Sequence, residues 1–221
     1  MNFQGITGVL VLLGIAYLLS NNRKEIKIRT VLWGLGLQFS LALVILKIPF
    51  VKSQFSLLDR IFRKIISFSE TGSNFLFESF IPGVGYHVAM MNFAFRALPV
   101  IIFFSSLIAM SYHFGIVQKI VKFISKIMSS TMRTSGPETL SVSANIFVGQ
   151  TEAPIIVRPF IKDMSNSELM AIMTGGFATT AGSVLALYVL WLEKIPGIAG
   201  HMLAASIMSA PAALALSLIH I

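Results

Sequence analysis

The chain has 221 residues, of which 55% are hydrophobic and only 12% are charged, and its mean hydropathy is +0.82. A soluble domain carries about twice that charged fraction, whereas apolar runs of about 20 residues with basic flanks are typical of a helical membrane protein with several spans. The absence of cysteine excludes disulfides, thiol catalysis and cysteine metal sites. The net charge of +8 comes largely from lysines and arginines beside the apolar runs, where such residues set membrane topology, so we expect no binding to nucleic acid.

The first part of the chain predicts three membrane spans and one amphipathic helix. The spans cover residues 3–20, 31–46 and 97–112, and a short basic loop between the first two is expected to face the cytoplasm. After Pro49, apolar and charged residues alternate at helical spacing, which predicts a helix at the outer membrane interface or against a neighbouring subunit. Its apolar face consists of Leu58, Ile61, Phe62 and Ile65, and its charged face of Asp59, Arg60, Arg63 and Lys64.

The middle of the chain predicts an interfacial helix followed by a re-entrant hairpin. Residues 116–128 alternate apolar positions with lysines, as in a helix on the inner membrane surface. Residues 135–159 are apolar enough to enter the membrane, yet Gly149 and Pro154 interrupt them. Each half has about ten residues, or about 15 Å of helix, which reaches halfway across the hydrocarbon. Basic residues at both ends favour a hairpin that opens to the cytoplasm.

The next predicted span runs from Glu168 to Trp191 and has an unusual middle. Residues 174–183 are rich in glycine and hydroxyl side chains and poor in bulky ones. One interpretation is a face for tight helix packing. The other is a helix that unwinds at mid-membrane and offers carbonyl and hydroxyl oxygens to an ion. A last apolar run begins at Ile198.

The hairpin tip, Gly149–Pro154, carries an amide and a carboxylate side by side in apolar surroundings. Such groups are unfavourable at that depth unless they bind something. Gln150 and Thr151 donate and accept hydrogen bonds, and Glu152 accepts when ionised, a combination that suits a neutral solute such as a nucleobase. The alternative is a polar turn outside the membrane, which explains the glycine and proline but not the long apolar flanks.

These residues resemble a known family. The segment from Ser143 to Pro154, continued by residues 157–160, is similar to the first hairpin of the concentrative nucleoside transporters, and the similarity covers residues 1–215. It implies an all-α polytopic membrane protein with half of an inverted-repeat transporter fold, in which residues 1–112 form scaffold-type helices and residues 113–215 part of a mobile transport domain. It also implies a homotrimer, in the plasma membrane (the bacterial inner membrane), that moves nucleosides by alternating access.

The resemblance further implies roles for single residues. The nucleobase contacts fall on Gln150, Thr151, Glu152 and Val184, and the sodium positions on Asn145, Val148, Thr179 and Thr180. Some members of the family use protons, generally with an altered hairpin motif. Because the motif is complete here, we expect sodium as the coupling ion and no other cofactor.

The family's second hairpin, which carries the ribose-binding side chains, has no counterpart in these residues. We therefore expect a truncated N-terminal fragment that does not transport on its own. Residues 216–221 match the conceptual translation of a transposon sequencing adapter and are expected to be an artefactual tail. Alternatives are a proton-coupled nucleoside transporter and a membrane scaffold or interaction protein without transport. The motifs of intramembrane enzymes, such as a zinc-binding His-Glu-x-x-His pair, are lacking, so we expect no enzymatic activity.

Overall fold

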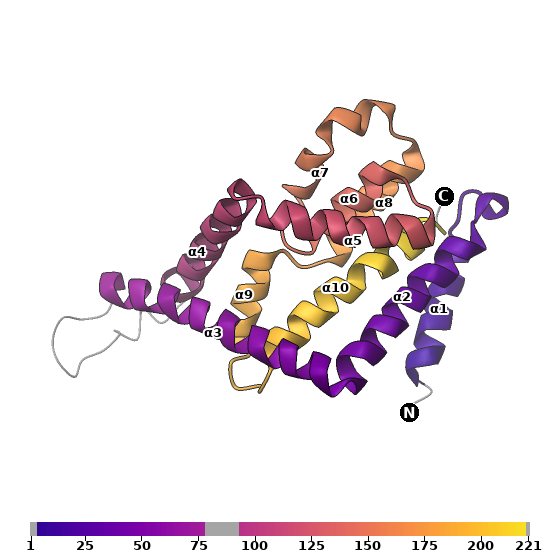
Figure 1. Cartoon of the computed structure of the whole chain (residues 1–221). Coiled ribbons are helices and arrows are strands. Elements are labelled where there is room, and N and C mark those ends of the chain that lie inside the picture. The colour runs from indigo at the N-terminus through magenta and orange to yellow at the C-terminus, as the bar shows by residue number, and fades with distance from the viewer. Residues whose placement is uncertain (1–3, 78–92, 220–221) are drawn as a thin grey trace.

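The computed structural model describes residues 4–77 and 93–219, and every regular element within these ranges is a helix (Figure 1). In chain order the helices are α1 (Gln4–Leu18), η1 (Arg23–Glu25), α2 (Ile28–Lys47), α3 (Pro49–Phe77), α4 (Phe93–His113), α5 (Ile116–Met132), α6 (Gly136–Asn145), α7 (Ala153–Ile156), η3 (Arg158–Asp163), α8 (Asn166–Ala178), α9 (Gly182–Trp191) and α10 (Ile198–Ser217). The all-helical class predicted from the sequence is confirmed.

Three stretches within the described residues are long and apolar enough to cross a membrane: α2, the α8–α9 pair and α10. A fourth candidate is the pair of α4 and α5, which bends by 78° at Phe114 and Gly115. Gly115 has a φ of 74°, a left-handed backbone that glycine adopts without strain. The chain is thus a multi-pass membrane protein. Helix α1 coincides with the first predicted span, but its 15 described residues are shorter than the roughly 20 that a full crossing needs.

Helix α10 lies at the centre of the packing, in contact with α2, α3, α6, α8 and α9 (Figure 1). One of the apolar cores joins α10 to α3, α4 and α9, and another joins it to α5, α6 and α8. Gly34 allows α2 to pack tightly against α10, because a Cβ there would lie 2.6 Å from the Cβ of Ala215. Residues 216–219, at the start of the predicted tail, continue this packing, and Ser217 and Ile219 are buried.

Only part of the apolar face predicted for α3 packs inside the chain: Phe62 and Ile65 contact the core that α3 shares with α4, α9 and α10. Helix α3 runs across the ends of α2, α9 and α10 (Figure 1). Of the predicted apolar face, Leu58 and Ile61 are exposed, whereas Asp59 of the predicted charged face is buried. The reason is polar pairing: the carboxylate of Asp59 bonds a backbone N–H of α10, which offsets the cost of its burial.

The helical hairpin is present, but its two arms differ. The first arm, α6, has ten residues, as predicted. The second arm is not a ten-residue helix: it is the single turn α7 followed by the 3-10 helix η3. Pro159 explains the difference, because it has no N–H to bond to Ile155 and it disfavours the α conformation at Arg158. Whether the hairpin is re-entrant in a bilayer stays a prediction.

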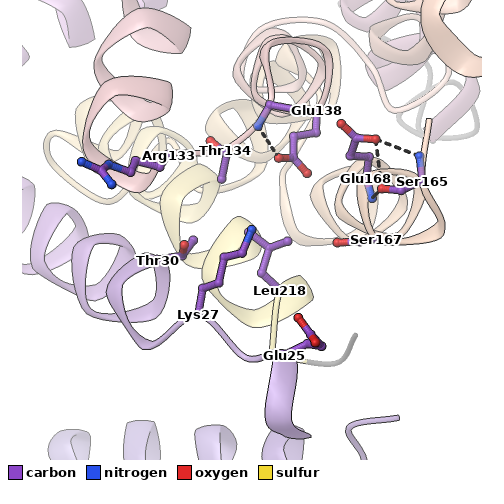
Figure 2. Close-up of a pocket in the computed structure, with 11 residues that line it drawn as sticks. Glu25, Lys27, Thr30, Arg133, Thr134, Glu138, Ser165, Ser167, Glu168 and Leu218 are labelled. Carbon is purple, nitrogen blue, oxygen red and sulfur yellow. Dashed lines mark hydrogen bonds between the residues drawn. The ribbon is translucent and has the colours of Figure 1, made fainter. Parts of the chain in front are cut away.

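Helices α6 and α8 begin side by side, and each begins with a capping box. The backbone N–H of Ser135 donates to Glu138 Oε1 at 2.6 Å, and that of Ser165 donates to Glu168 Oε2 at 2.8 Å. Both N-termini border a cavity of about 440 Å³ (Figure 2). The two helices therefore start at the same place, and their C-terminal ends meet at the hairpin tip.

Candidate functional site

The long apolar stretch 166–191 breaks where the sequence suggested that it could. Helix α8 ends at Ala178, Thr179 is extended with φ −118° and ψ 151°, and α9 begins at Gly182. The helix is therefore unwound at residues 179–181, and the use of this segment by an ion stays a prediction. The tight-packing interpretation also holds one turn earlier, because a Cβ on Gly175 would lie 2.7 Å from Val142 of α6.

The segment between α6 and the hairpin tip is held in place by two hydrogen bonds to its carbonyls, one from the break and one from α10. The N–H of Gly182 donates to the carbonyl of Phe147 at 3.2 Å, and the hydroxyl of Ser206 on α10 donates to the carbonyl of Ile146 at 3.3 Å. Gly182 permits this contact, since a Cβ there would lie only 2.6 Å from the Phe147 oxygen. The start of α9 and the tip thus form one unit.

Two of the predicted cation residues, Asn145 and Thr179, meet at the C-terminal ends of α6 and α8. The side-chain amide of Asn145 donates to the carbonyl of Gly175 at 2.7 Å and to the hydroxyl of Thr179. The Thr179 hydroxyl in turn donates to the same carbonyl at 2.8 Å. The side-chain oxygen Oδ1 of Asn145 is buried and accepts no hydrogen bond from the described residues.

This arrangement suits a cation. Two helix C-termini bring two partial negative charges to one point. The buried Oδ1 of Asn145 is a neutral oxygen with free lone pairs, of the kind that coordinates hard cations. Unwound carbonyls and helix C-terminal ends serve the same purpose in other transporter folds.

The predicted nucleobase residues line one cavity of about 430 Å³, a volume within the usual range for small-molecule sites. The cavity is also lined by Ala181 and Ser183 of the small-residue stretch 174–183, and by Tyr188, which the sequence did not single out. The predicted residues that line the cavity are Gln150, Thr151, Glu152, Thr179, Thr180 and Val184. The tip and the unwound segment therefore line one cavity.

Glu152 borders this cavity with its carboxylate folded over the tip. Thr151 Oγ1 donates to Glu152 Oε2 at 3.1 Å, and a Cβ on Gly149 would lie 2.1 Å from the same oxygen. Glu152 also lines a second, more apolar cavity of about 390 Å³ between the tip and α4, together with the buried Val148. Asn145 reaches the first cavity through Thr179, which lines it, whereas Val148 lines the second cavity on the α4 side of the tip.

Family models match most of the chain. A model of the N-terminus of Na⁺-dependent nucleoside transporters matches residues 7–80, and a nucleoside recognition model matches residues 94–194. The chain belongs to the sodium-dependent nucleoside transporter family. The second match contains the hairpin, the broken helix and both groups of candidate site residues.

Individual relatives agree with this assignment. An "Uncharacterized transporter" of Haemophilus influenzae is 43% identical over 96% of this chain and 49% of its own length. The "Sodium/nucleoside cotransporter 1" of Homo sapiens is 42% identical over 95% of this chain and 31% of its own length. A solved structure of CNTnw in an inward-facing, substrate-bound state superposes on this chain with a TM-score of 0.88 at 39% identity. The match covers 97% of this chain and 52% of the CNTnw chain. The chain therefore spans between about a third and about half of the length of these relatives.

Several features of the site lay outside the sequence predictions. The carbonyl of Gly175 accepts from both Asn145 and Thr179, and Ser206 reaches the tip from α10. Gly175 lies in the glycine-rich stretch that was singled out, but the sequence does not indicate which backbone carbonyls of that stretch accept hydrogen bonds from side chains. Ser206 is one serine in an apolar run, and no pattern distinguishes it.

Proposed function

We propose that the chain forms the cation-binding and nucleobase-binding half of a sodium-coupled nucleoside symporter in the plasma membrane, which acts as a homotrimer by alternating access. The observation that carries the proposal is the meeting of Asn145 and Thr179 directly behind a cavity lined by Gln150 and Glu152.

The positions of the proposed sodium residues and of the nucleoside cavity support coupling between sodium binding and nucleoside binding. A sodium ion would be held by Asn145 Oδ1, the Thr179 hydroxyl, the carbonyl of Val148 and the Thr180 hydroxyl, and a nucleoside would bind on the other side of the tip. Because the same unwound segment, 179–181, borders both places, sodium binding would order the wall that the nucleoside contacts.

Substrate recognition would come from the polar groups of the tip. Gln150 and Thr151 offer donors and acceptors to a nucleobase edge, and Glu152 accepts from an N–H or O–H group. Val184 supplies an apolar contact for the ring. In the exposed half-site of this chain these groups form one wall, and a second wall would exclude water and strengthen each hydrogen bond.

The proposal is tested by joining residues 1–215 to the half of the Haemophilus influenzae transporter that the chain does not match. We expect membrane vesicles containing this joined protein to take up labelled uridine in sodium and not in choline, and vesicles containing the 221-residue chain alone to take up none. Uptake driven equally well by a proton gradient in choline would favour the proton-coupled alternative. No uptake by correctly inserted joined protein under either gradient would favour the scaffold alternative and contradict the proposal.

A further inference from the structure

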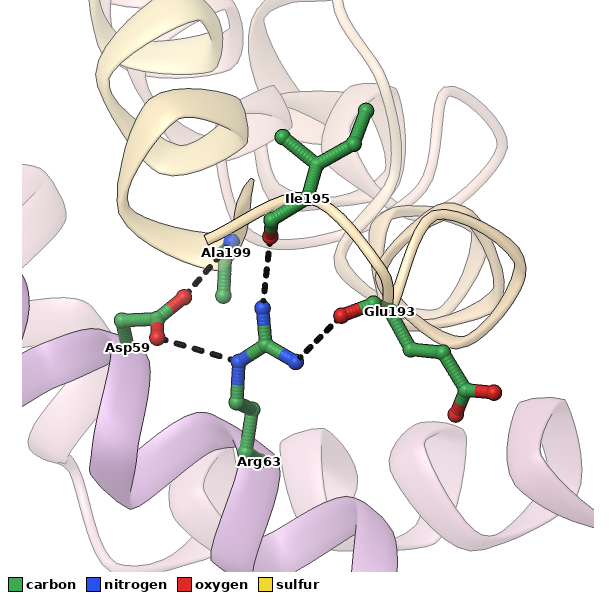
Figure 3. Close-up of polar contacts among 5 residues, drawn as sticks. All are labelled: Asp59, Arg63, Glu193, Ile195 and Ala199. Atoms are coloured by element: carbon green, nitrogen blue, oxygen red, sulfur yellow. Dashed lines mark hydrogen bonds and ion pairs between the residues drawn. The ribbon is translucent and has the colours of Figure 1, made fainter. Parts of the chain in front are cut away.

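Two charged residues of α3 face the turn between α9 and α10 instead of solvent (Figure 3). Asp59 is only 7% exposed, which is unusual for a carboxylate unless it is paired. Arg63 lies one helical turn further on, and its Nε donates to Asp59 Oδ2 at 3.0 Å. The pair lies far from the cavity and has no part in the site described above.

Asp59 caps a helix that is not its own. Its Oδ1 accepts from the backbone N–H of Ala199 at 2.9 Å, and Ala199 is the second residue of α10. A carboxylate is favourable at a helix N-terminus because it satisfies a free N–H and opposes the positive end of the helix dipole. The cap comes from 140 positions away in the chain, so it joins α3 to the start of α10.

Arg63 holds the other side of the same turn. Its two terminal nitrogens donate to the carbonyl of Glu193 at 3.1 Å and to that of Ile195 at 2.9 Å. Figure 3 shows the guanidinium between these carbonyls and Asp59, while the carboxylate of Glu193 points away from it. The planar, always charged fork of arginine makes the three bonds from three different nitrogens, whereas a lysine would have to reach all three acceptors from one nitrogen.

The turn that is held in this way ends α9, and the opposite end of α9 lines the candidate cavity. Helix α9 has ten residues, or about 15 Å, and its first residues include Ser183 and Val184 of the cavity wall. We propose that Asp59 and Arg63 are positioning residues that, in the conformation described above, fix α9, and with it this wall, by clamping the α9–α10 turn to α3. The consequence for substrate binding rests on the proposed function, whereas the clamp itself does not.

The clamp is tested first without any substrate. In the purified 221-residue chain, Asp59→Ala and Arg63→Ala should make the Ala199 N–H exchange with deuterium about tenfold faster or more, because each removes a charge-assisted bond from the turn. Asp59→Asn keeps an oxygen for Ala199 and should have a smaller effect. The matched controls are Arg60→Ala, on the exposed neighbouring position, and Glu193→Ala, since only the backbone of Glu193 is used. Exchange unchanged in Arg63→Ala, or changed equally in Glu193→Ala, would overturn the clamp.

The effect at the far end of α9 can be read with a thiol probe, because the natural chain has no cysteine. A single Ser183→Cys substitution should react with a maleimide at least about threefold faster when Arg63 is also replaced by alanine. A covalent bond between α3 and α10 should reverse this change. A Cβ on Gly200 would lie 3.6 Å from Phe55 Cβ, within the range for a disulfide, so the pair Phe55→Cys and Gly200→Cys can supply that bond. The same Cβ would lie 3.0 Å from the carbonyl oxygen of Phe55, so the oxidised pair with Arg63 intact is the reference for the strain of the bond itself.

Rescue distinguishes positioning from a general loss of structure. In the Arg63→Ala background, oxidation of the Phe55→Cys/Gly200→Cys pair should restore slow deuterium exchange at Ala199 and along residues 182–184, and reduction should abolish the restoration. Exchange that stays fast at residues 182–184 in the oxidised protein would show that the clamp does not position α9. If these results hold but the joined protein neither binds nor transports a nucleoside, the clamp stands and the proposed function fails.

Discussion

The contact between Gly182 and the carbonyl of Phe147 gives the sharpest structural prediction for the site. Replacing Gly182 with alanine would place a Cβ 2.6 Å from the Phe147 oxygen and 2.8 Å from Ile108 Cδ1. The isoleucine methyl can rotate away, but the backbone oxygen cannot. An ordinary carbon–oxygen contact is about 3.3 Å, so the two backbone segments would have to move apart by roughly a further 0.7 Å. This displacement would break the 3.2 Å hydrogen bond between the N–H of Gly182 and the carbonyl of Phe147.

The expected loss of stability follows from these two terms. The lost hydrogen bond costs about 1 kcal/mol and the overpacking about 1–3 kcal/mol. For a chain of this length, about 2–4 kcal/mol corresponds to a fall of roughly 5–15 °C in the unfolding temperature. The assay is thermal unfolding of the purified protein in detergent, with Gly36→Ala as the control, because no atom lies within 4 Å of a Cβ at that position. An unfolding temperature for Gly182→Ala within 1–2 °C of the control would refute the reasoning.

Two further predictions concern packing and substrate recognition. Gly34→Ala should lower the unfolding temperature because its Cβ would meet Ala215 at 2.6 Å, whereas Gly36→Ala, two residues away in open space, should raise stability by up to about 1 kcal/mol. Equal effects of the two substitutions in the same unfolding assay would contradict the α2–α10 packing. Glu152→Gln in the joined protein should reduce sodium-driven uridine uptake about tenfold or more without changing expression, because a charged acceptor is lost from the tip. Uptake that is unaffected by this change would remove Glu152 from the proposed site.

Much of the site could be predicted from local sequence because local residues create its special backbone. Gly149 and Pro154 interrupt an apolar run and mark the hairpin tip, and the small residues before Gly182 mark the break between α8 and α9. Both features appear where they were expected. The roles of Asn145 and Thr179 came from family resemblance, and their proximity is now explained by two helices that start together and end together.

The sequence failed where a contact depends on a distant partner. The pattern of α3 places Asp59 on a charged face, but the N–H that it caps lies in α10 and cannot be foreseen from residues 49–77. The prediction of a ten-residue helix for the second hairpin arm was wrong for a local reason. Pro159 was counted within that helix although it lacks the N–H that the helix needs. The first error arises from tertiary structure and the second from an overlooked signal.

The most direct test of the central claim is a sodium titration of nucleoside binding to the joined protein and its Thr179→Val variant. Valine has nearly the same shape as threonine but lacks the hydroxyl that contacts both the Asn145 amide and the carbonyl of Gly175. We expect the sodium concentration for half-maximal uridine binding to rise about tenfold or more in Thr179→Val, while binding at saturating sodium stays close to that of the unchanged protein. The same sodium dependence in both proteins, or equal binding in choline, would contradict a cation site at the meeting point of the hairpin tip and the broken helix.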